Sequence, residues 1–288
     1  MTIQIASFKE TKELAKKVAR KLKCKYSEII VKDFPDEESY IKLKKSPKGK
    51  TLVIFNSFAR EQNDRLIESI LAAGIGKDYK AKKVILAAPY FPYLRQDTHF
   101  EKFDSFSIKH IKNILDNFDS ILTVDPHLQR IKNIKKISHK MKRLTATSAI
   151  ADYLKKNFKS DFTIVGPDEE SKQWAQGVAT PLGKKAIVLK KKRFSWHKVK
   201  IQDVSLGKNV VIIDDIIGTG HTILETIKIA KKHGAKKITV IGIHGVLVDE
   251  KMTKKITKQA KLITTNTIDN KFAKIDVSPT ISQALRKA

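Results

Sequence analysis

The sequence predicts an α/β protein built from two similar doubly wound parallel sheets. Short runs of β-branched and apolar residues, typical of buried parallel strands, alternate with segments that have helical apolar periodicity. This alternation occurs in both halves of the chain, and strands in both halves end in acidic residues. With 288 residues, 41% of them hydrophobic, the chain is long enough for two cores. We therefore expect domains at 1–143 and 144–288, with a terminal helix that can pack back on the first.

The first half alternates strands and helices from its first residues. Apolar residues at helical spacing predict an amphipathic helix over Thr11–Leu22. A second helix, Asn63–Ala73, is expected to be closed by Gly74 and Gly76. Residues 132–144 are basic and poorly periodic, which suggests the domain boundary near Arg143. The other expected elements are the helix Ser107–Phe118 and the strands Ile3–Phe8, Ser27–Val31, Tyr40–Leu43, Thr51–Asn56, Lys83–Ala88 and Ile121–Val124.

The second half repeats this rhythm around a central apolar strand that begins at Val210. Helices are expected at Thr147–Leu154, after Thr222 and at Ser278–Arg286. The remaining expected strands are Phe162–Val165, Ala186–Leu189, Lys237–Ile243 and Lys261–Thr265.

The chain is strongly basic, with 58 Lys and Arg against 30 Asp and Glu and a net charge of +28. Such a charge attracts polyanions, including nucleic acid, without any specific site. Much of the excess is lysine spread through Lys9–Lys25 and Lys251–Lys261, otherwise helical segments, which is typical of a solvated helix face. We therefore expect no specific nucleic-acid partner.

The sequence also bounds the cellular compartment. Cys24 is the single cysteine, so no intramolecular disulfide is possible. No apolar run approaches the roughly 18 residues of a membrane helix, and the first residues lack the basic flank and apolar stretch of a signal peptide. A cytoplasmic protein without a membrane partner is expected.

The most informative stretch follows the central strand. The residues between that strand and the next helix form a strand-to-helix turn, which in an open α/β sheet lies at the carboxyl ends of the strands, where ligands bind. Gly218 and Gly220 permit tight backbone turns. The hydroxyls of Thr219 and Thr222 can join backbone N–H groups at the helix N-terminus, which suits a phosphate.

Asp214 and Asp215 come directly before this turn and would repel a phosphate. Carboxylates accept hydrogen bonds from sugar hydroxyls or bind a divalent cation, so a pentose phosphate fits. A Walker loop would need glycine and lysine where Asp215 and His221 stand, and a dinucleotide fingerprint would need a glycine where Ile223 stands. An ordinary turn with an exposed acidic pair is the alternative, but such a turn would not require two acids, two glycines and two threonines at one strand end.

Two segments of the first half are unusual for connectors. Asp33–Leu43 contains an aromatic residue and acids before an alternating strand, which composition alone explains as a hairpin turn. Pro89–Asp97 is rich in aromatics and proline. In it, Arg95 can bind a phosphate as a fork and Gln96 can contact a base or a phosphate.

Two further segments allow more than one interpretation. Asp125 and His127 would point the same way in an extended segment, although Asp125 as a helix N-cap is an alternative. Lys190–Arg193 follow the strand Ala186–Leu189, and four consecutive cations usually form a solvated loop.

Together these motifs resemble those of the ribose-phosphate diphosphokinases, in a short archaeal-like form. The loop Asp214–Thr222 resembles the phosphoribosyl-diphosphate loop that this family shares with the type I phosphoribosyltransferases. Phe34–Glu38 resembles the family's Phe-x-Asp-Gly-Glu segment, with Glu37 in place of the glycine. The Tyr-x-x-Arg-Gln-Asp run ending at Asp97 resembles its second ATP-binding segment. Six such motifs occur in the family's order.

The resemblance implies two domains of the type I phosphoribosyltransferase kind and a role for each motif. The residues implied in ATP binding are Phe34, Asp36, Glu37, Glu38, Arg95, Gln96 and Asp97. Those implied in ribose 5-phosphate binding are Arg193, Asp214, Asp215, Gly218, Thr219, Gly220, His221 and Thr222. His127 and Asp168 are the implied metal residues, with Mg²⁺ as the cofactor, and Lys191 and Arg193 the catalytic ones.

The implied reaction transfers the β,γ-diphosphoryl group of Mg²⁺–ATP to the 1-hydroxyl of ribose 5-phosphate. A homo-oligomer, at least a dimer, is expected, because in the family the segment matched by Phe34–Glu38 reaches the ATP of a neighbouring subunit. A type I phosphoribosyltransferase and a non-catalytic regulatory homologue are the alternatives. The first leaves the Phe34 and Arg95 segments unexplained, and the second leaves Lys191 and His127 unexplained.

Overall fold

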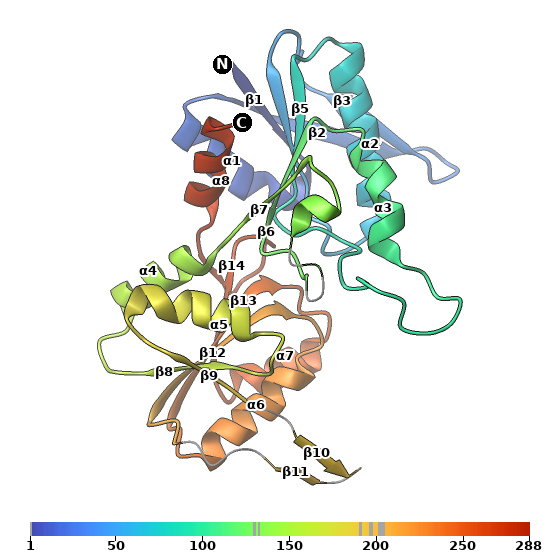
Figure 1. Cartoon of the computed structure of the whole chain (residues 1–288). Helices are drawn as coiled ribbons and strands as arrows, with labels where there is room; N and C mark the ends of the chain where they lie inside the picture. Colours follow the sequence, from blue (N-terminus) through green and yellow to red (C-terminus); the bar gives the residue numbers. More distant parts are fainter. Residues whose placement is uncertain (1, 129–130, 132, 190–191, 196–197, 201–204) are drawn as a thin grey trace. The chain divides into compact units, whose positions relative to one another are not determined.

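The computed structural model describes the whole chain except residues 1, 129–130, 132, 190–191, 196–197 and 201–204 (Figure 1). It forms two compact units. Unit 1 comprises Met1–Thr145, Thr267–Asp269 and Val277–Ala288, and unit 2 comprises Ala146–Asn266 and Asn270–Asp276. Within the described residues, no helix combines the length and the apolar character needed to cross a membrane.

Unit 1 contains a seven-stranded sheet in the order β3-β2-β1-β4-β5-β6-β7. β3 is antiparallel to β2, and the other neighbours are parallel. The strand order reverses between β1 and β4, as in doubly wound folds. The strands are β1 Ile3–Ser7, β2 Lys25–Asp33, β3 Ser39–Leu43, β4 Thr51–Phe55, β5 Lys83–Ala87, β6 Ser120–Val124 and β7 Met141–Leu144. The α-helices are α1 Lys12–Leu22, α2 Gln62–Asp78, α3 Ser107–Leu115 and α8 Ser278–Arg286.

The terminal helix α8 belongs to unit 1, where it packs against α1 (Figure 1). Ile281 and Leu285 are buried on its inner side. The Arg286 guanidinium donates to the backbone carbonyl of Lys21 at 2.9 Å. Helix α8 therefore covers one side of α1.

Helix α2 runs through Gly74 and Gly76, so the expectation that these glycines close it was wrong. A Cβ on Gly76 would lie 2.9 Å from Leu52 Cδ2 and 2.9 Å from Val84 Cγ2. Leu52 and Val84 belong to β4 and β5. The glycine lets the helix approach the sheet closely, which outweighs its low helix propensity.

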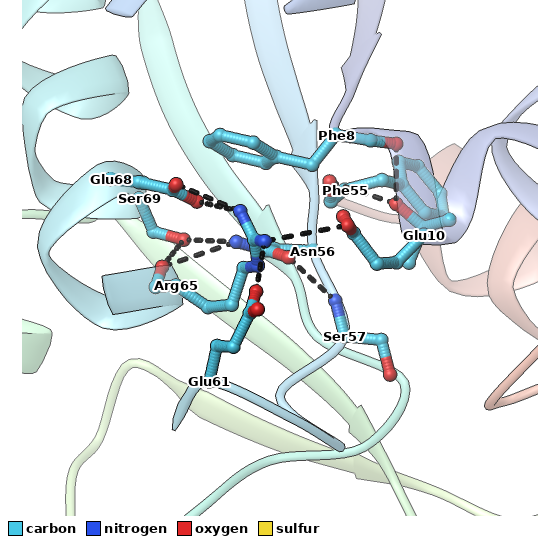
Figure 2. A network of polar contacts seen from close by, with 10 residues as sticks. Phe8, Glu10, Phe55, Asn56, Ser57, Glu61, Arg65, Glu68 and Ser69 are labelled. Carbon is cyan, nitrogen blue, oxygen red and sulfur yellow. Dashed lines mark hydrogen bonds and ion pairs between the residues drawn. The ribbon is translucent and has the colours of Figure 1, made fainter. Parts of the chain in front are cut away.

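A polar network ties the start of α2 to the end of β4 (Figure 2). Arg65 Nη1 donates to both carboxylate oxygens of Glu68, at 2.8 and 2.6 Å. Its Nη2 is ion-paired with Glu61 and lies 3.5 Å from Glu10 Oε1. The Asn56 amide donates to the Arg65 carbonyl at 3.1 Å. This network fixes the first turn of α2 beside the strand-order reversal.

Unit 2 contains a six-stranded parallel sheet in the order β15-β14-β13-β12-β8-β9, and β10 and β11 form a separate antiparallel pair. Figure 1 shows α4 and α5 on one face of the sheet and α6 and α7 on the other. The strands are β8 Thr163–Gly166, β9 Ala186–Val188, β10 Lys192–Ser195, β11 Lys198–Lys200, β12 Asn209–Ile217, β13 Lys237–Gly245, β14 Lys261–Thr265 and β15 Ala273–Ile275. The α-helices are α4 Thr147–Asn157, α5 Lys172–Ala179, α6 His221–Lys232 and α7 Glu250–Thr257.

The core of unit 2 follows from the alternation of side chains along its strands. Val210 and Ile212 face α6, where they meet Ile223 and Ile227 in one buried cluster. Ile256 of α7 belongs to the same cluster. The two parallel-sheet α/β units confirm the predicted fold class.

Candidate active site

The acidic pair lies within strand β12 and not in the turn after it. β12 continues to Ile217, which pairs with Gly245 of β13, so the turn to α6 begins at Gly218. Asp215 is buried, and its Oδ1 accepts from the backbone N–H of Ile216 at 2.8 Å. The Asp214 and Asp215 carboxyl groups lie close to each other, since the charge of Asp215 and a side-chain hydrogen bond with it both act on Asp214.

Asp214 lies in a field of negative charge. The residue is partly exposed, but its carboxyl group lies among many protein atoms that shield it from water. Burial raises the pKa of its carboxyl well above the ordinary value, and the carboxylates of Asp215 and Asp168 raise it further. The structure thus brings Asp168 and the acidic pair together at the carboxyl end of the second sheet.

Asp168 is held in a tight turn after β8. Its Oδ1 accepts from the backbone N–H of Ser171 at 3.0 Å, and the Ser171 hydroxyl donates to the Asp168 carbonyl at 2.7 Å. A Cβ on Gly166 would lie 2.8 Å from the Ser171 hydroxyl oxygen. The turn therefore depends on a glycine at the end of β8.

The loop Gly218–Thr222 connects β12 to α6 with its amide groups at a helix N-terminus. Gly220 is the N-cap of α6 and has φ +86°, which disfavours any other residue. A Cβ there would lie 2.8 Å from Ile256 Cδ1. Thr219 and His221 are exposed, with Thr219 Oγ1 3.2 Å from His221 Nδ1. This arrangement suits an anion such as a terminal phosphate.

A segment that the sequence analysis did not single out holds this loop. The backbone N–H of Leu247 donates to the Ile217 carbonyl at 2.9 Å, and that of Val248 donates to the Gly218 carbonyl at 3.2 Å. Asp249 then caps α7 by accepting from the Met252 N–H at 2.9 Å. The position of this segment directly after β13, the strand beside β12, could have predicted its role, because neighbouring parallel strands end at the same side of the sheet.

The residues implied in ATP binding lie in unit 1. The segment Phe34–Glu38 is the turn of the β2–β3 hairpin, in which the Glu37 N–H donates to the Phe34 carbonyl at 2.9 Å. Phe34, Asp36, Glu37 and Glu38 are all exposed, and Phe34 packs edge-to-face on Tyr40 with a centroid distance of 6.0 Å. Glu37 has φ +71°, a conformation that glycine adopts without strain.

The second implied ATP segment follows β5. Leu94 is buried and anchors it, while Arg95 is exposed. The Ser107 hydroxyl donates to Gln96 Oε1 at 2.6 Å, and Asp97 is buried. The guanidinium is thus presented to solvent from a fixed loop.

Asp125 contradicts the expectation of an extended segment. It has φ +36° and is fully buried, where it accepts from the Thr145 hydroxyl at 3.3 Å and lies 3.5 Å from an Arg143 nitrogen. No helix begins at Asp125, so the N-cap alternative was also wrong. The left-handed backbone turns the chain after β6, and the alternation that would align its side chain with that of His127 does not apply. His127 follows in unit 1 and is partly exposed, whereas Asp168 belongs to unit 2.

The catalytic residues implied by the resemblance are only partly covered. Lys191 lies outside the described residues, and of Arg193 the structure describes the backbone, in β10. The basic run predicted as a loop includes the start of an antiparallel pair, in which Arg193 is opposite Val199.

Comparisons with known proteins identify the class of both units. Residues 3–118 match the N-terminal domain of ribose phosphate pyrophosphokinase, and residues 128–281 match the phosphoribosyl transferase domain. The fold is also that of a crystal structure of phosphoribosylpyrophosphate synthetase from Mycobacterium smegmatis, with a TM-score of 0.87 and 22% identity over 99% of this chain and 98% of that one.

Curated relatives narrow this class to one family. Ribose-phosphate pyrophosphokinase from Thermoplasma acidophilum is 32% identical over 96% of both chains. That from Methanopyrus kandleri is 28% identical over 95% of both, and ribose-phosphate pyrophosphokinase 1 from Archaeoglobus fulgidus is 31% identical over 88% of this chain and 89% of its own. The chain belongs to the ribose-phosphate pyrophosphokinase family, enzymes also called ribose-phosphate diphosphokinases. The resemblance inferred from the motifs is thereby confirmed.

Proposed function

We propose that this protein transfers the β,γ-diphosphoryl group of ATP to the 1-hydroxyl of ribose 5-phosphate, yielding phosphoribosyl diphosphate and AMP. The observation that carries the proposal is the carboxyl end of the unit 2 sheet, where an acidic pair stands directly before an anion-binding turn. Family membership supports the same reaction. In this reaction the sugar oxygen forms a bond to the β-phosphorus, the bond to the oxygen of AMP breaks, and the hydroxyl proton is released.

The turn after β12 would bind the 5-phosphate of the sugar. The amide groups of Gly218–Thr222 and the hydroxyls of Thr219 and Thr222 would donate to the phosphate oxygens. Asp214 and Asp215 would accept from the ribose hydroxyls. His221 is exposed beside Thr219 and would add a further donor.

The residues of unit 1 would bind the nucleotide. Arg95 is exposed and can hold a phosphate through two nitrogens. Phe34 is 50% exposed, so its ring could stack on an adenine. Gln96, Asp97 and the acids Asp36, Glu37 and Glu38 complete the proposed nucleotide contacts.

Mg²⁺ is the proposed cofactor. Among the described residues, no group of three acidic, histidine or cysteine side chains forms a ready metal site. Mg²⁺ nevertheless requires only one or two protein carboxylates when it is bound together with phosphates and water. Asp214 and Asp168 lie close enough for their negative charges to interact, and a cation near Asp168 would offset that repulsion. His127 would contribute through water, and the bound ion would neutralise charge on the transferring phosphates.

Positioning and charge neutralisation are the parts that the protein must supply for phosphoryl transfer. Lys191 and Arg193 are the proposed catalytic cations on the transferring group. The proposal predicts AMP as the nucleotide product, because attack at the β-phosphorus releases AMP whereas an ordinary kinase releases ADP. Nucleotide chromatography after incubation with ATP, ribose 5-phosphate and Mg²⁺ should show AMP and phosphoribosyl diphosphate in equal amounts. ADP as the main product would refute the proposal, as would diphosphate release from phosphoribosyl diphosphate with an added base.

We further propose a homo-oligomer, at least a dimer. The exposed Phe34 and Tyr40 pair at the hairpin supports it, because exposed aromatic rings are enriched in protein interfaces. Light scattering at micromolar concentration should detect no stable monomer. A fully active monomer would contradict this proposal while leaving the reaction assignment intact.

A further inference from the structure

The amino end of the unit 2 sheet, opposite the proposed active site, is lined by lysines. Three neighbouring strands begin with them. Lys208 directly precedes β12, Lys236 directly precedes β13, Lys237 opens β13, and Lys261 opens β14. All four side chains are exposed. Adjacent strands are about 4.8 Å apart, so these charges form a short row across the sheet.

The helices of unit 2 add further lysines to the same end. In a doubly wound fold the helices run antiparallel to the strands, so they finish where the strands begin. α6 ends in Lys231 and Lys232, α7 has Lys254 and Lys255 in its last turn, and Lys258 directly follows α7. These side chains are all exposed. Together with the strand-start lysines we call them the amino-end lysine cluster.

Acidic residues do not balance this cluster. Among the described residues at the amino end of this sheet, the acidic residue is Asp161, which precedes β8. Its carboxylate is already ion-paired with Lys184. Asp168, Asp214 and Asp215 lie at the opposite, carboxyl end of the strands. The amino end of the unit 2 sheet is therefore rich in lysine, whereas these three carboxylates lie at the end that holds the proposed substrate site.

Stabilisation of helix ends explains only part of this pattern. Lysines in a last helical turn interact favourably with the helix dipole, which accounts for those at the ends of α6 and α7. The dipole effect falls off within one turn and does not account for Lys208, Lys236, Lys237 and Lys261, which precede or open strands. Uncompensated like charges repel one another, so an anionic partner would gain the full attraction of this surface.

We propose that the amino-end lysine cluster is a docking surface for the phosphate backbone of nucleic acid. Its charges are spread over three strands and two helix ends instead of converging on one point, which suits a linear polyanion better than a small anion. Lysine acts as a point charge toward phosphates, and the described residues of this end include no arginine, the residue best suited to reading bases. Binding should therefore be blind to sequence.

The composition of this surface favours nucleic acid over a membrane. Peripheral binding to membranes generally combines basic residues with inserted apolar side chains. Among the described residues of unit 2, the exposed large hydrophobic side chain is Val248, which follows β13 at the carboxyl end of the sheet. A surface of lysines without an apolar anchor fits a solvated phosphate backbone.

The test measures the binding of a fluorescein-labelled 20-nucleotide RNA of mixed sequence to the full chain by anisotropy, at increasing KCl concentrations. The test variant removes the strand-start charges: Lys208→Gln, Lys236→Gln, Lys237→Gln and Lys261→Gln. A control variant removes the same charge from exposed positions of unit 1: Lys9→Gln, Lys77→Gln, Lys80→Gln and Lys109→Gln. A third variant replaces the four strand-start lysines by arginine and keeps the charge.

The salt dependence gives the decisive readout. For single strands, the slope of log affinity against log salt falls by about 0.7 for each phosphate that the protein no longer neutralises. The glutamine variant at the strand starts should therefore show a slope smaller by up to about 3 and an affinity at least about tenfold weaker. The unit 1 control should weaken much less, and the arginine variant should bind as the wild type does. Thermal denaturation checks that each variant is folded.

Equal weakening by the two glutamine variants would overturn the proposal, because the attraction would then come from net charge alone. Tighter binding to vesicles of phosphatidylserine and phosphatidylcholine than to the RNA would also overturn it. A strong preference among RNA sequences would contradict the backbone mode of binding.

Discussion

Removing the Arg65 side chain should strongly destabilise unit 1. The Arg65 side chain is 15% exposed, and its guanidinium donates two short hydrogen bonds to the Glu68 carboxylate, whose side chain is 3% exposed (Figure 2). Substitution of Arg65 by methionine leaves the Glu68 carboxylate buried without its partner. Breaking such a pair costs about 3–5 kcal/mol. The contacts with Glu10 and Glu61 add little, because both are well exposed and exposed ion pairs contribute about 0.2–1 kcal/mol each.

The destabilisation should also depend on pH. Burial raises the pKa of Glu68, and the hydrogen bonds and charge of Arg65 lower it in part. A carboxyl whose pKa is raised by folding binds its proton more tightly in the folded state, so stability falls as pH rises from the ordinary value toward the folded one. Without Arg65 the pKa of Glu68 rises further. The variant should therefore be destabilised more near pH 8 than near pH 5.

Urea denaturation of wild type, Arg65→Met and Arg65→Met/Glu68→Leu at both pH values would measure these effects. The double variant replaces the pair by apolar side chains and should recover most of the stability, since such replacements are often neutral. If the double variant were as unstable as the single one, or if the destabilisation did not vary with pH, the uncompensated charge of Glu68 could not be its cause.

Further predictions concern the turns and the proposed catalytic cations. Glu37→Gly should stabilise the protein by about 0.5–1 kcal/mol in denaturant titrations. A non-glycine residue in a left-handed conformation costs roughly 1–2 kcal/mol, and the greater backbone entropy of glycine in the unfolded chain takes back about 0.5–1 kcal/mol of the gain. A destabilised variant would refute this account. Gly220→Ala should cost about 1–3 kcal/mol in thermal denaturation and raise the KM for ribose 5-phosphate, whereas Gly218→Ala, where a Cβ meets no atom within 4 Å, should be nearly silent in stability. Lys191→Ala or Arg193→Ala should lower kcat by roughly 10²–10³-fold in the AMP assay, with little change in the affinity for ATP. Similar decreases in Lys190→Ala and Lys192→Ala would mean that the run is only a basic surface.

The sequence predicted those strands and helices whose residues carry a clear periodic pattern of their own. Lys261–Thr265 and Ser278–Arg286 occur at the expected bounds, because an apolar run and a helical repeat carry their own periodicity. The helix through Gly76 was not predictable in this way. Gly76 is required because a larger side chain would collide with Leu52 and Val84. These two residues are distant in sequence and meet Gly76 only when the helix packs on the sheet.

The candidate site shows the same division. The loop Gly218–Thr222 was found because all of its chemistry is contiguous in the sequence. The support from Leu247 and Val248 was missed, because it arises only when β13 lies beside β12. The left-handed backbone of Asp125 was also missed, and its side chain contacts Arg143 and Thr145, which lie about twenty residues further along the chain.

The packing of α8 on α1 has a consequence for the order in which the chain folds. During synthesis the ribosome releases the strands of unit 1 first and α8 last, with nearly all of unit 2 between them. The side of α1 that α8 covers stays exposed until that last segment emerges. A nascent chain arrested after unit 2 should therefore carry an incomplete first unit beside a complete second one, which exposes apolar surface to chaperones and proteases.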